Sequence, residues 1–163
     1  MMQDYPKLLA NGDRVGFTML NRLFCFSTCK NDLKSAALKQ KDNLSPESAG
    51  ICEQDFYLSN IELLKHAGVE VEQSAQKVEF EGILHSFGPI VYLKPSFGVT
   101  FKEIRSRFSG KNFVSAQSAL LLEGEISVKN LNMKSGTLFI KEDINDLTHD
   151  DPASNLQFQA VDI

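Results

Sequence analysis

Pairs of apolar residues, with one residue between the two members, recur along the second half of the chain. The clearest pairs are Leu120/Leu122, Ile126/Val128, Leu131/Met133 and Leu138/Ile140. Their first members lie six, five and seven residues apart. Spacing near six, in short strands separated by Gly or Asn, is typical of a parallel β-helix, whose strands stack on the coils above and below. The same alternation fits an antiparallel meander or sandwich with tight turns. The pattern therefore predicts a short-stranded β fold and leaves these two arrangements open.

Three other stretches of this half of the chain have patterns of their own. Residues 100–108 carry Phe101, Ile104 and Phe108 at helical spacing, which predicts a short helix inserted between the strands. Residues 143–152 are acidic and polar, which is typical of a solvated loop. Residues 156–161 alternate weakly and predict a last strand.

The first seventy residues show a different pattern, in which short apolar runs are followed by helical stretches. Residues 15–20 and 23–27 have the length and composition of strands that are buried on both faces of a sheet. Residues 31–38 have a helical pattern, and Asn31 and Asp32 suit its N-cap and first turn. This part of the chain is predicted to alternate strands and helices.

A longer helix is predicted over residues 46–67. Ser45 suits the N-cap, Pro46 suits the first helical position, and Glu47 adds an acid to the first turn. Gly68 follows where a helix C-cap belongs.

The composition narrows the class of protein. Of the 163 residues, 42% are hydrophobic and 23% are charged, which is ordinary for a soluble globular chain. No run approaches the ~20 consecutive apolar residues of a membrane span, and the start has no secretory-signal pattern. The net charge of −4 argues against a dedicated nucleic-acid binder. It does not exclude a nucleotide, because a phosphate site needs only one or two local cations.

The three cysteines, Cys25, Cys29 and Cys52, lack the spacing of a disulfide framework. They fit reduced thiols in a cytoplasmic protein. A zinc site at Cys25 and Cys29 would need two further ligands, and the nearest histidine, His66, does not have zinc-finger spacing. We therefore interpret the cysteines as structural or incidental and predict no metal site.

One short segment, residues 26–32, has the right residues for contact with phosphate. There a predicted strand ends, Lys30 follows at once, and a helix begins. Open α/β sheets bind ligands outside the carboxyl ends of their strands, and helix N-termini present N–H groups to anions. The pattern is common, and a solvated surface lysine is the alternative interpretation of Lys30.

Other candidate residues are poorer. Asp4 is a metal ligand or a turn residue, and the turn is favoured; His85 is interpreted as structural. No Ser/His/Asp or Cys/His arrangement is found, and the glycines do not form a Gly-rich phosphate loop. The chain alone is not expected to cradle a nucleoside triphosphate in the usual way.

Several runs of the chain resemble the UDP-sugar pyrophosphorylases, in the order in which that family carries them. Residues 1–7 (Met-Met-Gln-Asp-Tyr-Pro-Lys), 14–18 (Arg-Val-Gly-Phe-Thr) and 26–31 (Phe-Ser-Thr-Cys-Lys-Asn) carry the first part of the resemblance. They are similar to the family's Met-Gln-Asp-Tyr-Pro-Lys segment, its Arg-Val-Gly-Phe-Thr strand and its Pro-Val-Lys-Asn-Asn element. Residues 57–69 resemble the helix after that lysine, and residues 113–138 resemble the family's C-terminal β-helix.

The resemblance implies an α+β fold. Residues 1–70 would be the end of a Rossmann-like catalytic domain, with short strands and two helices, and residues 71–163 would be a C-terminal left-handed β-helix domain. It also implies a transferase of nucleotide-sugar metabolism, a nucleotidyltransferase that converts UTP and a monosaccharide 1-phosphate into UDP-sugar and pyrophosphate with Mg²⁺. Glucose, galactose, xylose, arabinose and glucuronic acid 1-phosphates are the expected sugar substrates.

The phosphate-contacting lysine of that family corresponds to Lys30. By this resemblance Lys30 is expected to be catalytic, and Lys30 and Asn31 are expected to bind substrate. The family's proline and valine before the lysine are Thr28 and Cys29 here, and its second asparagine is Asp32. The backbone path and the role of the added acid therefore depart from the family pattern.

The family's Gly-rich nucleotide loop, uridine pocket and most sugar contacts would precede Met1, so the chain alone is expected to be inactive. The alternative function is a stand-alone β-helix interaction module without catalysis. A hexapeptide-repeat acyltransferase would need more coils and a well-placed histidine. No nucleic acid or membrane partner is expected. Self-association through the β-helix domain is expected, because an exposed sheet end offers an unpaired edge.

Overall fold

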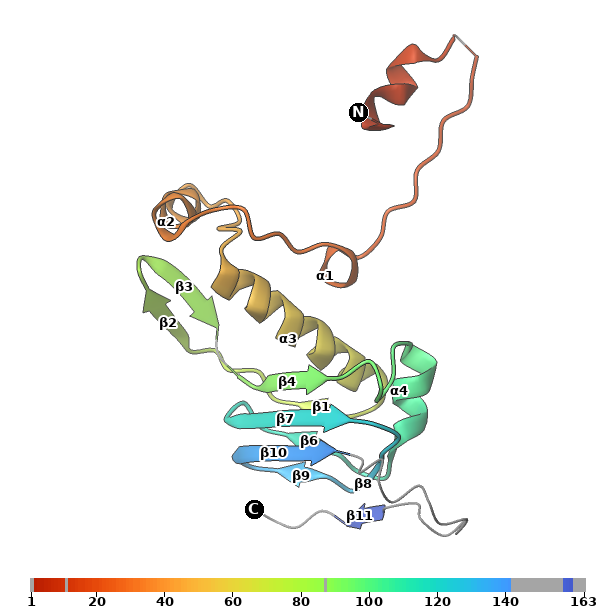
Figure 1. The fold of residues 1–163 in the computed structure, drawn as a ribbon, viewed down its shortest axis with the longest axis vertical. Coiled ribbons are helices and arrows are strands. Elements are labelled where there is room, and N and C mark those ends of the chain that lie inside the picture. Colours follow the sequence, from red (N-terminus) through yellow and green to blue (C-terminus); the bar gives the residue numbers. More distant parts are fainter. Residues whose placement is uncertain (1, 11, 87, 142–156, 160–163) are drawn as a thin grey trace.

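Nine short strands form three parallel sheets in the computed structural model, which describes residues 2–10, 12–86, 88–141 and 157–159 (Figure 1). In hydrogen-bonded order the sheets are β1 (Glu70–Val71), β6 (Phe113–Val114) and β9 (Asn132–Met133); β10 (Gly136–Lys141), β7 (Ser118–Glu123) and β4 (Ile90–Leu93); and β11 (Gln157–Gln159), β8 (Ser127–Lys129) and β5 (Phe108–Ser109). Along the chain, successive strands of these sheets belong to the first, second and third sheet in turn, three times over.

The register of the sheets places the sequence's apolar pairs on top of one another. Leu120 of β7 lies opposite Leu138 of β10, and Val114 of β6 lies opposite Met133 of β9. These two pairs of partners are 18 and 19 residues apart, about three times the spacing of six seen in the sequence. Parallel pairing in all three sheets excludes the antiparallel meander for these strands, since a meander pairs consecutive strands in opposite directions.

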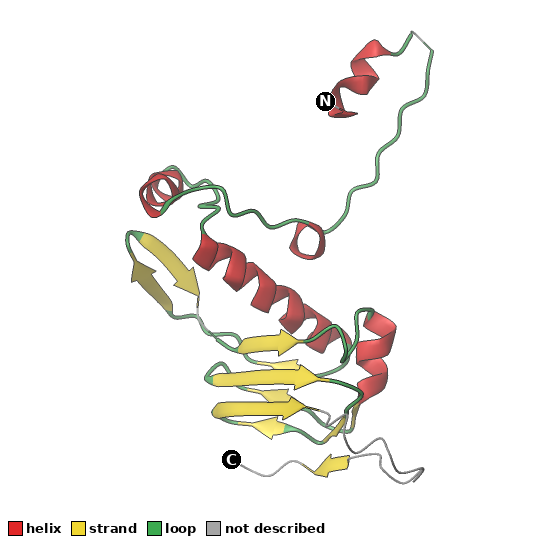
Figure 2. Cartoon of the chain, viewed as in Figure 1, coloured by secondary structure: helices red, strands yellow, loops and turns green. Residues whose placement is uncertain are grey.

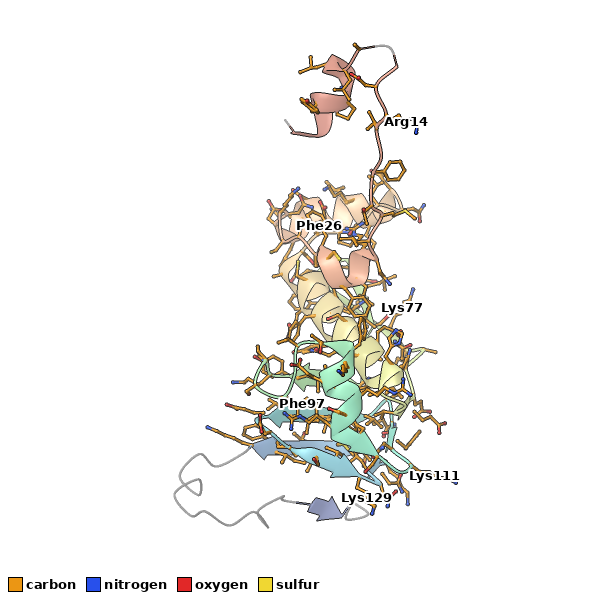
Figure 3. All side chains as sticks on the ribbon, turned by 90° about the vertical axis from the view of Figure 1, so that its right-hand side faces the viewer. Arg14, Phe26, Lys77, Phe97, Lys111 and Lys129 are labelled. Carbon is orange, nitrogen blue, oxygen red and sulfur yellow. The ribbon has the colours of Figure 1, made fainter. Side chains whose placement is uncertain are left out.

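The alternating residues of these strands build the core. Along β7, Ser118, Leu120 and Leu122 are buried while the residues between them are half-buried. All four predicted apolar pairs contribute to one hydrophobic cluster, with Leu138 partly buried against it. Phe97, which follows β4, is fully buried and packs edge-on against Phe108 with ring centroids 5.8 Å apart. Figure 3 shows Phe97 next to α4 (Phe101–Arg107).

The long predicted helix is α3 (Ala49–His66), which lies along the strands on the side of β4 (Figure 2). Its N-cap is Ser48, whose hydroxyl accepts from the Ile51 N–H, so the helix begins three residues later than predicted. Gly68 ends it with a φ of +86°, a conformation that glycine adopts without steric cost. The apolar face of α3 reaches the core through Ile61 and Leu64.

A buried amide joins α3 to the edge of the second sheet. Asn60 is 5% exposed, and its Nδ2 donates to the Val91 carbonyl of β4 at 3.0 Å. Edge strands carry carbonyl groups that need partners when they are covered. Asn60 supplies this partner where the helix covers the edge.

Replacing Asn60 with leucine should lower the free energy of unfolding by about 1–3 kcal/mol, because the substitution leaves the buried Val91 carbonyl without its donor. Urea denaturation of both proteins, with the slope of each transition compared, measures the change. An unchanged midpoint would show that the Asn60 amide does not stabilise this packing.

Two insertions interrupt the first round of strands. The hairpin of β2 (Lys77–Phe80) and β3 (Ile83–Ser86) is antiparallel, and α4 follows β4. Thr100 is the N-cap of α4 and forms a capping box with Glu103, so the predicted short helix is confirmed. Hydrogen bonds from the Val99 and Thr100 backbone to Glu103 lower the pKa of that carboxyl, the Val99 bond contributing most.

The N-terminal region departs from the predicted strands. It contains the 3-10 helix η1 (Met2–Leu8), α1 (Arg22–Cys25) and α2 (Leu33–Lys41). The strand predicted at residues 15–20 is wrong for this structure, because those residues pair with none of the described strands. Figure 3 shows Arg14, just before them, far from the sheets. The strand predicted at residues 23–27 is also wrong, because short apolar runs do not distinguish strands from helices and this one begins as α1.

The remaining predictions have mixed outcomes. The helix predicted at residues 31–38 is confirmed as α2, with Asp32 as its N-cap. β11 confirms a strand near the end of the chain, whereas the acidic loop predicted at residues 143–152 lies outside the described residues. Among the described helices, none has the length and apolar character needed to cross a membrane.

Candidate functional site

The segment predicted to contact phosphate is an irregular stretch between α1 and α2, with Lys30 just before the helix. The side chain of Lys30 is exposed, and no carboxylate of the described residues lies within 4.0 Å of its ammonium group. Its backbone is held in place, since the Lys30 N–H donates to the Glu47 carbonyl at 2.9 Å. The segment therefore presents a solvated cation from an anchored backbone.

Asp32, the acid that departs from the family pattern, acts as a helix cap. Its Oδ1 accepts from the Ser35 N–H at 2.8 Å, and this bond is the main cause that lowers the pKa of Asp32. A carboxylate at this position also favours the positive end of the α2 dipole. Asp32, directly after Lys30 and Asn31, therefore has a structural role as the N-cap of α2.

Asn31, the other predicted substrate contact, also has a structural partner. Its Nδ2 donates to the Pro46 carbonyl at 2.7 Å, and its N–H donates to the Glu47 carbonyl at 3.2 Å. The half-buried Asn31 side chain thus links residues 26–32, called the Lys30 segment below, to the residues before α3.

A hollow of about 610 Å³ opens beside this segment. It is lined by Cys29, Asn31, Asp32, Leu33, Lys34 and Ala49. The lining combines one carboxylate, which is used as the cap, with an exposed lysine in the first turn of α2. The arrangement suits a transient contact with an anion better than enclosure of a whole nucleotide, in line with the absence of a Gly-rich loop from the sequence.

A second cavity, of about 340 Å³, lies between α3 and the β2–β3 hairpin. Its lining residues include Glu53, Tyr57 and His85 and contain no lysine or arginine. The Tyr57 hydroxyl donates to Glu53 Oε1 at 2.5 Å, and this bond raises the pKa of Tyr57 to about 12. Without a permanent cation the cavity does not suit phosphate. His85 is buried and its ring lies against Gly50, which supports the structural interpretation of this histidine.

The described residues do not build a metal centre. No group of three or more His, Cys, Asp or Glu side chains that could hold an ion is found among them. Asp4 lies in η1, where its carboxylate pairs with Lys7 at 2.7 Å, and Cys25, Cys29 and Cys52 are free thiols. These residues therefore do not fit a magnesium site of their own.

Sequence reasoning missed Glu47 and Thr28. Glu47 is not in the first turn of α3; it precedes the helix and contacts several parts of the Lys30 segment. No linear pattern could have shown this, because the contacts join residues 8 to 19 positions apart.

The amino-acid sequence of the chain is similar to those of curated plant proteins. The chain is 33% identical over 141 residues to a UDP-sugar pyrophosphorylase of Arabidopsis thaliana. It is 31% identical to that of Oryza sativa subsp. indica and 30% identical to that of Oryza sativa subsp. japonica over the same length. Each match covers 86% of this chain, which spans 22% of the length of each relative. No family model matches the chain. The resemblance predicted from the sequence motifs is confirmed.

Proposed function

We propose that this chain is the C-terminal part of a uridylyltransferase. Over 86% of its length it is similar to a segment of the UDP-sugar pyrophosphorylases. The full-length enzyme would use UTP and a monosaccharide 1-phosphate and release UDP-sugar and pyrophosphate. The observation that carries this proposal is the family similarity, which includes the segment of the exposed Lys30.

The proposed role of Lys30 follows from the charge changes of uridylyl transfer. A phosphate oxygen of the sugar 1-phosphate attacks the α-phosphorus of UTP, a new O–P bond forms, and the bond from the α-phosphorus to the bridging oxygen breaks. Pyrophosphate leaves with the electron pair of that bond. Negative charge develops on the phosphate oxygens, and a nearby ammonium group stabilises it. Lys30 offers such a group beside the N-terminus of α2.

The fold supports a division of this chain into two parts with different roles in the proposed enzyme. Residues 71–163, with three parallel sheets visited in turn, are proposed to form a left-handed β-helix domain. Residues 1–70 are proposed to complete the catalytic domain. In that setting residues 15–20 would become a strand, because Phe17 and Met19 are 92% and 88% exposed in this chain, and an unpaired apolar strand is stabilised by a sheet partner.

The remaining parts of the active site would come from the rest of the full-length enzyme. We include magnesium among them, because a divalent cation neutralises charge on transferring phosphates, and its ligands would lie outside the residues described in this chain. The free cysteines fit a reducing, cytoplasmic compartment.

The chain alone should release no pyrophosphate from UTP and glucose 1-phosphate, because it lacks a loop that cradles the nucleotide. The full-length protein should release pyrophosphate with at least one sugar 1-phosphate of a panel. A coupled assay of pyrophosphate release, run on both proteins with and without magnesium, measures the difference. Pyrophosphate release by the chain alone would contradict the proposal that most of the active site lies elsewhere in the full-length enzyme. If the full-length protein released no pyrophosphate with any sugar 1-phosphate of the panel, a non-catalytic interaction module would be favoured.

A further inference from the structure

Glu47, just before α3, contacts both the Lys30 segment and α2. Its Oε1 accepts from the Thr28 hydroxyl at 2.9 Å, and its Oε2 accepts from Lys39 Nζ of α2 at 2.7 Å. Its backbone carbonyl accepts from the N–H groups of Lys30 and Asn31. Glu47 therefore binds a side chain before Cys29 and the backbone after it, and joins both to α2.

The backbone of Glu47 is in an unusual conformation for a residue with a side chain. Its φ is +52°, a left-handed value at which glycine would avoid the steric cost. Residues held in such conformations cluster at functional sites, where surrounding contacts compensate for the strain. The compensating contacts here are the hydrogen bonds to the Lys30 segment and to Lys39.

The charge of Glu47 interacts mainly with Lys39 and least with Lys30. The bond from Lys39 is the largest cause that lowers the pKa of Glu47, the Thr28 hydroxyl is the second, and Lys30 contributes least. Thr28 and Lys39 each donate to one oxygen of the Glu47 carboxylate, and the Lys30 side chain is exposed. The Glu47 carbonyl thus holds the Lys30 backbone, while the Glu47 carboxylate holds the Thr28 side chain and pairs with Lys39.

We infer that Glu47, acting through Thr28 and its own carbonyl, is a positioning residue that aims Lys30 at the phosphate groups of the substrate. The inference rests on the proposed function for its consequence in catalysis. Its geometric part, anchoring of residues 28–31 by Glu47, can be tested on this chain alone.

The first test measures amide hydrogen exchange at Lys30 and Asn31 by NMR in the 163-residue chain. Thr28→Val removes the hydroxyl that Glu47 accepts from and should speed exchange at both amides by about 10-fold, the scale of a lost hydrogen bond to a charged group. Thr28→Ser keeps the hydroxyl and should restore the original rates. Glu47→Gly removes the carboxylate at a φ that glycine tolerates and should have the same effect as Thr28→Val.

The control variant is Glu62→Gln, which removes a comparable surface pair with Lys65 on α3 and should leave the exchange of Lys30 and Asn31 unchanged. The amides of Leu120 and Leu122 report on the core and should keep their rates in every variant. Should Glu47→Gly unfold the chain, Thr28→Val decides the result. Unchanged exchange at Lys30 and Asn31 in Thr28→Val would overturn the inference.

The second test uses pyrophosphate release by the full-length enzyme. Thr28→Val should lower kcat/KM, Thr28→Ser should restore it, and adding Thr28→Val to Lys30→Ala should cause no further loss, because Glu47 and Thr28 act through Lys30. An independent further loss in the double variant would overturn the positioning role. If Lys30→Ala itself changes nothing, the proposed function of Lys30 fails, while the exchange data still decide whether Glu47 anchors the segment.

Discussion

Replacing Phe97 with alanine should lower the free energy of unfolding of this chain by about 3–5 kcal/mol. The side chain is fully buried and packs against Phe108 inside the cluster that joins α3, α4 and the three sheets. Its removal deletes apolar contacts and leaves a cavity that a close-packed core fills only in part. A loss of this size is a large fraction of the 5–15 kcal/mol that is typical of a whole domain.

The matched control is Phe17→Ala, which deletes the same atoms from a side chain that is 92% exposed. Its effect on stability should stay within about 0.5 kcal/mol. Chemical denaturation with equal slopes for all three proteins measures both changes. Equal midpoints for the Phe97 and Phe17 variants would mean that Phe97 is not part of the core that stabilises the chain.

Replacing Lys30 with alanine in the full-length enzyme should lower kcat/KM for uridylyl transfer by at least about 10-fold, because a charged contact to a phosphate is lost. Lys30→Arg, which keeps the charge but changes its shape, should retain part of the rate. Steady-state kinetics with UTP and a sugar 1-phosphate, with kcat and KM reported separately, show whether the loss arises in binding or in the chemical step.

Lys41→Ala is the matched control, because Lys41 is also an exposed lysine but ends α2 at the opposite terminus from Lys30. It should leave both kinetic constants unchanged. Unchanged kinetics in Lys30→Ala would return Lys30 to the role of a solvated surface residue and remove the proposed catalytic contribution of this chain.

Helices of the chain were predictable where local chemistry determines them. Asp32 and Thr100 are N-caps because a short oxygen-bearing side chain satisfies the N–H groups of the first turn, and Gly68 ends α3 because it takes a positive φ. The start of α3 was displaced: Ser45 and Ser48 are both suitable caps, and in the structure Ser48 is the cap while Glu47 before it has a positive φ.

The candidate site was only partly predictable. Lys30 was predicted from its place before a helix, and the structure places it in an exposed segment before α2. Its anchoring by Glu47 and Thr28 depends on contacts between segments far apart in the sequence. Local patterns carry no information on such contacts.

By itself the sequence indicated three helices, the apolar pairs of the core and the resemblance to UDP-sugar pyrophosphorylases, because caps, periodicity and ordered motifs act over short distances along the chain. Only the tertiary structure decided that the strands pair in parallel, because alternation with a spacing near six fits both a meander and a stack of coils. It also decided the state of residues 15–20, because a strand requires hydrogen-bonding partners. None of the described strands pairs with residues 15–20, so these residues form no strand and stay exposed.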